Sequence, residues 1–229
     1  MTLLLGSAVS IALVHTIIGI DHTLPFVVLG RAEGWSLRKT LVLTGVCGVG
    51  HVVSSVVLGL LGIGLGVGIT SLDGIEASRG SLAAWTLIVF GLGYAAWSLA
   101  RQRRRARETH AHSGGVVHAH THGRATHQHP DGKSLTTVTA WSLFVIFVLG
   151  PCEPLIPLLM IPAATMGTGA VLMVTGAFTI VTIGTMLVLV TLGYHGLQVH
   201  RLRWLERHGQ VAAGLAIATS GMAIQVLGI

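Results

Sequence analysis

Apolar residues fall in six long runs that are separated by short polar stretches. The runs cover about Leu3–Leu29, Leu41–Ile69, Leu82–Ala100, Val138–Ala163, Gly169–Leu197 and Val211–Ile229. A helix needs about 20 apolar residues to cross the roughly 30 Å hydrocarbon core of a bilayer. The pattern therefore predicts an all-α polytopic membrane protein with six transmembrane helices.

The composition agrees with a membrane protein. The chain has 229 residues, of which 52% are hydrophobic and only 10% charged, and its mean hydropathy is +0.77. A soluble domain carries about 25% charged residues. The net charge of +6 would suggest a nucleic-acid partner in a soluble protein. Here we attribute it to basic loops on one face of a membrane, and we expect no nucleic-acid partner.

Thirteen of the fourteen lysines and arginines lie in three alternating connections, between the first and second, third and fourth, and fifth and sixth runs. The remaining one, Arg79, lies near Asp73 and Glu76 on the opposite side. The positive-inside rule then places the three basic connections in the cytoplasm and both termini outside. We expect a bacterial-type inner membrane. No basic residue precedes the first run, so we interpret it as a retained helix rather than a signal peptide.

The two halves of the chain resemble each other at an offset of 131 residues. Gly19-Ile-Asp-His-Thr-Leu falls on Gly150-Pro-Cys-Glu-Pro-Leu, and Thr44-Gly45 falls on Thr175-Gly176. Each half holds three predicted spans, an odd number, so the second half must insert upside down. This predicts two inverted three-helix repeats, an architecture of many secondary transporters. The expected divisions are residues 1–100, a cytoplasmic loop over 101–137, and residues 138–229.

Glycines and prolines interrupt the first and fourth runs at matching points. Gly19 and Pro25 interrupt the first, and Gly150, Pro151, Pro154 and Pro157 the fourth. Proline removes a backbone donor and crowds the preceding turn, so we expect helices 1 and 4 to be broken. Inverted-repeat transporters bind substrate near such breaks.

Ionisable and thiol groups cluster beside these breaks, where they are costly in a bilayer and mark substrate paths or buried partners. The offset pairs Asp21 and His22 with Cys152 and Glu153, and we expect Asp21 and Glu153 to be the only acidic residues inside spans. Imidazole with carboxylate, and a thiolate in addition, suits Ni, Co or Zn. The candidate metal ligands are His15, Asp21, His22, His51, Cys152 and Glu153.

Simpler interpretations stand beside each of these candidates. An intramembrane histidine is often a hydrogen-bonded packing residue, and the offset partner of His15 is the apolar Ile146. Asp21 could hold an imidazole in one tautomer instead of binding the ion. We interpret Cys47, one turn before His51, as a small core residue.

Seven histidines crowd the third connection, among glycine, serine and proline. They are His110, His112, His118, His120, His122, His127 and His129. Tracts of this kind bind transition metals through neutral imidazole. We expect this segment to be disordered and to act as an accessory metal-binding loop, the alternative being an inert linker.

His15…Asp21-His22, Gly50-His51 and the histidine-rich loop resemble the nickel/cobalt transporter superfamily, which includes the NiCoT, NicO and UreH-like membrane proteins. The resemblance implies permease-type transport of Ni or Co, with these residues selecting the metal. Five residues separate His15 from Asp21 where the NiCoT signature has four, which favours the NicO/UreH-like branch. Leu149-Gly-Pro-Cys-Glu-Pro-Leu is similar to the Pro-Cys element of TauE/SafE-like and CcdA/DsbD-like six-span proteins.

The leading hypothesis is a secondary transporter of divalent transition metals, not an enzyme, with Ni or Co as substrate, Zn as a third candidate, and no tightly bound cofactor. The chain has no Gly-x4-Gly-Lys-Ser/Thr motif for ATP, so energy would come from a gradient or a partner. A cytoplasmic loop that loads the site favours efflux. A homo-oligomer or an accessory metallochaperone is a possible partner.

Two alternatives remain open at this stage. One is a thiol-disulfide electron conduit through Cys47 and Cys152, which would need the two thiols close together. The other is an exporter of sulfite or an organic anion, which would need basic groups at the site. Asp21 and Glu153 disfavour an anion electrostatically.

Overall fold

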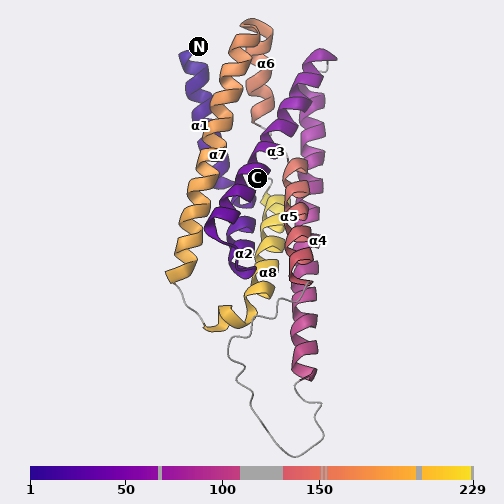
Figure 1. The fold of residues 1–229 in the computed structure, drawn as a ribbon. Helices are drawn as coiled ribbons and strands as arrows, with labels where there is room; N and C mark the ends of the chain where they lie inside the picture. The colour runs from indigo at the N-terminus through magenta and orange to yellow at the C-terminus, as the bar shows by residue number, and fades with distance from the viewer. Residues whose placement is uncertain (67–68, 109–130, 151, 153, 200–202, 228–229) are drawn as a thin grey trace, which may run out of the picture.

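The computed structural model describes residues 1–66, 69–108, 131–150, 152, 154–199 and 203–227. These residues form helices, and no strand occurs among them. The helices are α1 (Thr2–Ile18), the 3₁₀ turn η1 (Ile20–His22), α2 (Leu24–Ala32), α3 (Leu37–Gly64), α4 (Ile69–Glu108), α5 (Asp131–Leu149), α6 (Leu155–Thr165), α7 (Thr168–Val199) and α8 (Arg203–Leu227). Figure 1 shows them as an elongated bundle.

Four of the described helices are long and apolar enough to cross a membrane: α3, α7, α8 and the Gly74–Arg103 part of α4. α1 together with η1 and α2, which bend by 81° at their junction, adds a fifth if the bent pair is counted as one broken span. The expected fourth run is divided into two shorter apolar stretches, Thr139–Leu149 and Leu155–Thr165. The prediction of an all-helical protein with several membrane spans is confirmed in this form.

Large apolar side chains cover the outside of the bundle. On α7, for example, Leu172 is 73% exposed and Ile180 is 75% exposed. In water such faces would promote aggregation, whereas in a bilayer they contact lipid tails at no cost. The exposure pattern therefore agrees with an integral membrane protein.

The first predicted helix break is present, and its cause is local. Gly19 ends α1 with an extended backbone (φ −68°, ψ 93°), and Pro25 stands at the start of α2. Proline suits this position because the first turn of a helix has no use for its missing amide hydrogen. A Cβ on Gly19 would lie 2.2 Å from Nδ1 of His22, so glycine leaves room for that ring.

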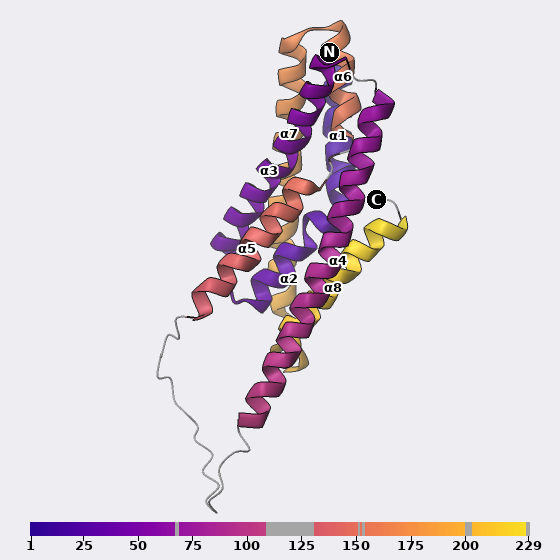
Figure 2. The same cartoon turned by 90° about the vertical axis from the view of Figure 1, so that its right-hand side faces the viewer.

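Three boundaries of matching helices in the two halves lie 131 residues apart. The offset relates the starts Leu24 and Leu155, the starts Leu37 and Thr168, and the ends Ile18 and Leu149. Figures 1 and 2 show that matching helices run in opposite directions: α1, α2 and α4 descend from the end that holds the N-terminus, whereas α5, α6 and α8 rise toward it. Likewise α3 rises and α7 descends, and α8 stops about halfway along the molecule.

Packing follows the same correspondence. α1 packs on α7, and the matching helix α5 packs on α3, while α4 and α8 form the most extensive helix pair. Glycines allow α4 and α8 to approach closely, since a Cβ on Gly91 would lie 2.5 Å from the backbone of Gly214. Small residues at such contacts are typical of membrane helices.

The structure corrects one expectation about charge. α4 begins at Ile69 rather than near Leu82, and it carries Glu76 and Arg79 inside a candidate span. Glu76 is buried at 1% exposure, so the expectation that Asp21 and Glu153 are the only acidic residues inside spans is wrong. A hydropathy average counts the charges of Glu76 and Arg79 separately, and it therefore placed the segment in a connection. In the folded helix the two side chains form an ion pair.

Both ends of the expected loop over 101–137 are helical in the structure. α4 continues to Glu108, and α5 begins at Asp131. The seven predicted metal-binding histidines between them lie outside the described residues, and so does Glu153. The connection between α2 and α3 lies toward the same end of the molecule as the end of α4 (Figures 1 and 2), and Arg31 is in the last turn of α2 just before it. Which side of a membrane that end faces stays a prediction.

Candidate metal centre

Three histidine rings from three elements converge where α1 breaks. His15 comes from the last turn of α1, His22 from η1 and His51 from α3. The His22 ring lies between the other two, with its centroid 4.7 Å from that of His15 and 5.0 Å from that of His51. The His15 and His51 rings are stacked at 6.4 Å. The break thus turns His22 back toward the side chains of two long helices.

Cys152 joins this cluster from the second half of the chain. Its Sγ lies 3.9 Å from Nε2 of His15. One ligand atom each from His15, His51 and Cys152 lies within 4.8 Å of the others. His51 and Cys152 are buried at 2% and 0% exposure, and His15 is partly buried. A small shift of side chains would bring three donors onto one ion.

The tautomer of His22 follows from its neighbours. Its Nδ1 lies 3.0 Å from Oδ1 of Asp21 and 3.2 Å from the carbonyl oxygen of Gly19. Since a carbonyl oxygen can only accept a hydrogen bond, and an ionised carboxylate likewise, Nδ1 carries the hydrogen. In the neutral ring Nε2 then presents a lone pair, and this buried atom has no hydrogen-bond partner among the described residues.

His51 is held in the same way. Its Nδ1 donates to the carbonyl oxygen of Phe147 at 3.3 Å, and its buried Nε2 has no hydrogen-bond partner in the part of the chain that the structure describes. Buried polar atoms without partners are rare because each forfeits its solvation. Two such nitrogens in adjacent rings fit a pair of ligand atoms, since metal-binding histidines ordinarily anchor their other nitrogen on a carboxylate or carbonyl.

A cavity of about 750 Å³ reaches this cluster. It lies against α1, the early turns of α4 and the end of α8, and its lining includes His15, Asp21, His22 and His51. Ser81 and Gln225, which are hydrogen-bonded to each other, line it on the other side. Most of the lining is apolar, so an ion that entered would meet its strongest partners at the histidines.

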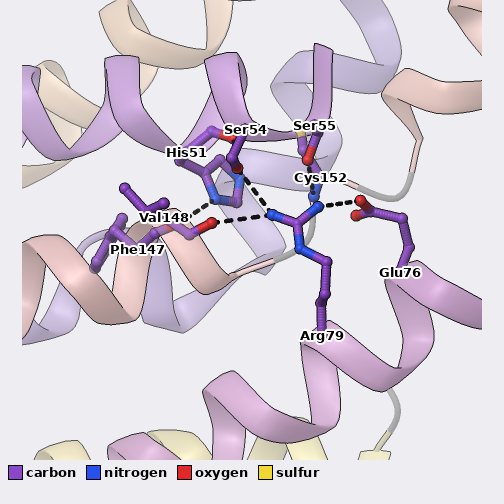
Figure 3. A network of polar contacts seen from close by, with 8 residues as sticks. All are labelled: His51, Ser54, Ser55, Glu76, Arg79, Phe147, Val148 and Cys152. Atoms are coloured by element: carbon purple, nitrogen blue, oxygen red, sulfur yellow. Dashed lines mark hydrogen bonds and ion pairs between the residues drawn. The ribbon is translucent and has the colours of Figure 1, made fainter. Parts of the chain in front are cut away.

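Arg79 and Glu76 are the polar groups that the sequence interpretation missed. Arg79 donates to Glu76 on its own helix, to Oγ of Ser54 at 2.9 Å and to the carbonyl oxygen of Val148 at 2.9 Å (Figure 3). The i,i+3 spacing of Glu76 and Arg79, at the start of an apolar run, was the signal that could have placed them on one helix face.

The structure thus brings together most of the predicted ligands. His15, His22, His51 and Cys152 meet, whereas Asp21 contacts the back of His22 and is not in the group of converging ligand atoms. Glu153 and the loop histidines lie outside the described residues. Cys47 packs in a different hydrophobic cluster from Cys152, and neither of these two cysteines is in a disulfide.

Comparison of the chain with protein-family models, with curated proteins and with solved structures found no match.

Proposed function

We propose that the protein is a membrane transporter of divalent transition-metal ions, with Ni²⁺ or Co²⁺ as the first candidates and Zn²⁺ as the third. One observation carries the proposal. Among the described residues, the Nε2 atoms of His22 and His51 are buried without a hydrogen-bond partner, beside His15 and Cys152, at the break of a membrane helix. Other buried polar atoms in the described chain also have no hydrogen-bond partner, but these two belong to adjacent imidazole rings that lie next to a third histidine and a thiol.

The donor set supports a late first-row metal. Imidazole and thiolate are the ligands that such ions prefer, whereas Mg²⁺ and Ca²⁺ prefer oxygen. His15, His51 and Cys152 would supply three donors, and Nε2 of His22 a fourth. Asp21 would remain behind His22, raising its basicity and balancing the charge of the ion.

Two inverted repeats would give this site its transport mechanism. The common offset of the helix boundaries and the opposite directions of matching helices support such repeats. In transporters of this kind the substrate binds near the helix breaks, and the halves rock to expose the site to one side and then the other. α5 packs on α4, whereas the matching pair of α1 and α8 has no comparable packing among the described residues. The cavity occupies that more open side.

In this scheme the ion enters the cavity and binds as Cys152 loses its proton, which leaves through the same opening. Metal binding and proton release are coupled because the ligating thiol must be a thiolate. Release on the other side would require the halves to separate along α4 and α5. The histidine-rich loop would load the site from the cytoplasm, which favours efflux.

The test is transport in sealed proteoliposomes. We expect the native protein to move Ni²⁺, Co²⁺ or Zn²⁺ in both uptake and efflux assays, and His22→Ala and Cys152→Ser to lose most of that activity. Cys47→Ser is the matched control, since Cys47 lies in a different cluster from Cys152. Transport that is unchanged in both site variants would refute the proposed site.

The alternative functions stay predictions that the same variants test. A thiol conduit would lose activity in Cys47→Ser as well as in Cys152→Ser. An anion exporter needs a basic group open to its substrate, and the three described donor contacts of Arg79 already go to Glu76, Ser54 and Val148.

A further inference from the structure

The partly buried Arg79 lies where three helices meet, and its described side-chain contacts go to Glu76, Ser54 and Val148. It connects α4 to Ser54 on α3 and to Val148 at the end of α5 (Figure 3). Its side chain is 18% exposed, and that of its partner Glu76 is 1% exposed. Burying an ion pair in a membrane helix costs free energy, so its presence requires a role other than simple stability.

The first contact concerns the end of α5. The last carbonyl groups of a helix have no intrahelical donors and must be satisfied in another way. Arg79 donates to the carbonyl oxygen of Val148, and His51 donates to that of Phe147. The arginine and the proposed ligand therefore hold consecutive carbonyl groups of one helix end.

The second contact concerns the turn of α3 that carries His51. Ser54 accepts from Arg79 and donates to the carbonyl oxygen of His51 at 2.8 Å. The next residue, Ser55, accepts from the backbone amide of Cys152 at 3.1 Å. Arg79 thus reaches the backbone of His51 through Ser54, and the adjacent Ser55 on the same turn of α3 holds the backbone of Cys152, which stands on the other half of the chain.

We propose that Arg79 is the positioning residue of the metal centre: by joining the end of α5 to the His51 turn of α3, it holds His51 and Cys152 at ligand distance. This inference rests on the proposed function. It deepens that function because it names what sets the separation of two ligands from opposite repeats. Metal ligands generally need such support, and loss of the supporting group costs about 10–100-fold in metal affinity.

Arg79→Lys is the sharpest variant. Lysine keeps the positive charge that Glu76 needs, so no buried carboxylate is left unpaired. A single ammonium group lacks the planar fork of arginine and does not reproduce its geometry toward Ser54 and Val148. Ser54→Ala is a milder second variant that keeps both charges and removes only the link to His51. The matched control is Arg38→Gln, an exposed arginine at the start of α3.

The experiment is a Co²⁺ titration of the purified full-length chain, followed by the absorption band that arises from thiolate-to-cobalt charge transfer. The histidine-rich segment contains no cysteine, so the band reports binding at a thiol. We expect Arg79→Lys to raise the Co²⁺ Kd by about 10–100-fold and to alter the band at saturation. Ser54→Ala should change the Kd and the band in the same direction but by a smaller amount. Arg38→Gln should change neither the Kd nor the band.

The outcomes separate this inference from the proposed function. If the native chain binds Co²⁺ with a thiolate band, and Arg79→Lys and Ser54→Ala keep the same Kd and spectrum, the positioning role is refuted and the proposed site stands. A lower thermal stability with an unchanged Kd and spectrum would also refute it, since Arg79 would then be only structural. If the native chain shows no thiolate band, the proposed function itself fails.

Discussion

Gly19→Ala tests whether the position of the His22 ring matters for metal binding. The backbone of Gly19 has a φ of −68°, which alanine adopts without strain. The consequence is therefore purely steric. The added Cβ would lie 2.2 Å from Nδ1 and 2.7 Å from Cε1 of His22, and 3.0 Å from the carbonyl oxygen of His15.

The size of the effect follows from these distances. Ordinary contacts of a Cβ begin near 3.4 Å, so the ring must retreat by about 1 Å. That movement would lengthen the contacts of Nδ1 with Asp21 and Gly19, now 3.0 and 3.2 Å, beyond hydrogen-bonding distance. Metal sites tolerate errors of about 0.5 Å. We therefore expect a loss of about 10–100-fold in Co²⁺ affinity.

The assay is the Co²⁺ titration of the full-length chain, with thermal unfolding measured in parallel. Gly6→Ala is the matched control, because it lies on the same helix and a Cβ there meets nothing within 4 Å. The control should keep the native affinity and gain slightly in stability, since alanine favours a helix over glycine by about 1 kcal/mol. Gly19→Ala with native affinity and spectrum would contradict the assigned geometry of His22.

Further outcomes are expected elsewhere in the molecule. Cys152→Ser should abolish the thiolate-to-cobalt band, whereas Cys47→Ser should keep it. Loss of the band in Cys47→Ser would contradict the assignment of Cys152 as the thiol ligand. Gly91→Ala places a Cβ 2.5 Å from the backbone of α8 and should cost about 1–3 kcal/mol of stability in thermal unfolding, while Gly93→Ala, with nothing within 4 Å, should cost none. Deletion of residues 109–130 should lower cellular tolerance to the metal and leave the thiolate band unchanged; unaltered tolerance and accumulation would refute the loading role.

The helix breaks could be predicted because their causes are local. Gly19, Pro25 and Pro154 alter the backbone wherever they occur, and they stand at or beside the ends of α1, α2 and α6 in the structure. The common offset of 131 residues also reappears in the helix boundaries, because the two halves repeat the same order of elements.

The contacts within the site could not be predicted in the same way. The offset pairs Cys152 with Asp21, yet in the structure Cys152 contacts His15. The repeat identifies which positions of the two halves are equivalent. It does not say which side chains are in contact, because equivalent residues need not lie next to each other. The offset pairs His15 with the apolar Ile146, so the repeat alone did not identify His15 as a member of the histidine and cysteine cluster.

Arg79 and Glu76 show a second limit of sequence interpretation. A hydropathy average counts each charge at its full cost in lipid and so assigned both residues to a connection. In the structure they neutralise each other across one helical turn, and the remaining donors of Arg79 satisfy groups on α3 and α5. That compensation depends on residues 25 and 69 positions away, which no local window contains.

The ligand shell of a bound ion tests the central claim most directly. The measurement is the X-ray absorption spectrum of a chain that lacks residues 109–130 and is loaded with one equivalent of Zn²⁺. The account predicts one sulfur at about 2.3 Å and imidazole nitrogens at about 2.0–2.1 Å. It also predicts that the sulfur signal disappears in Cys152→Ser. A shell of oxygen and nitrogen atoms without sulfur, or the absence of stoichiometric binding, would contradict it.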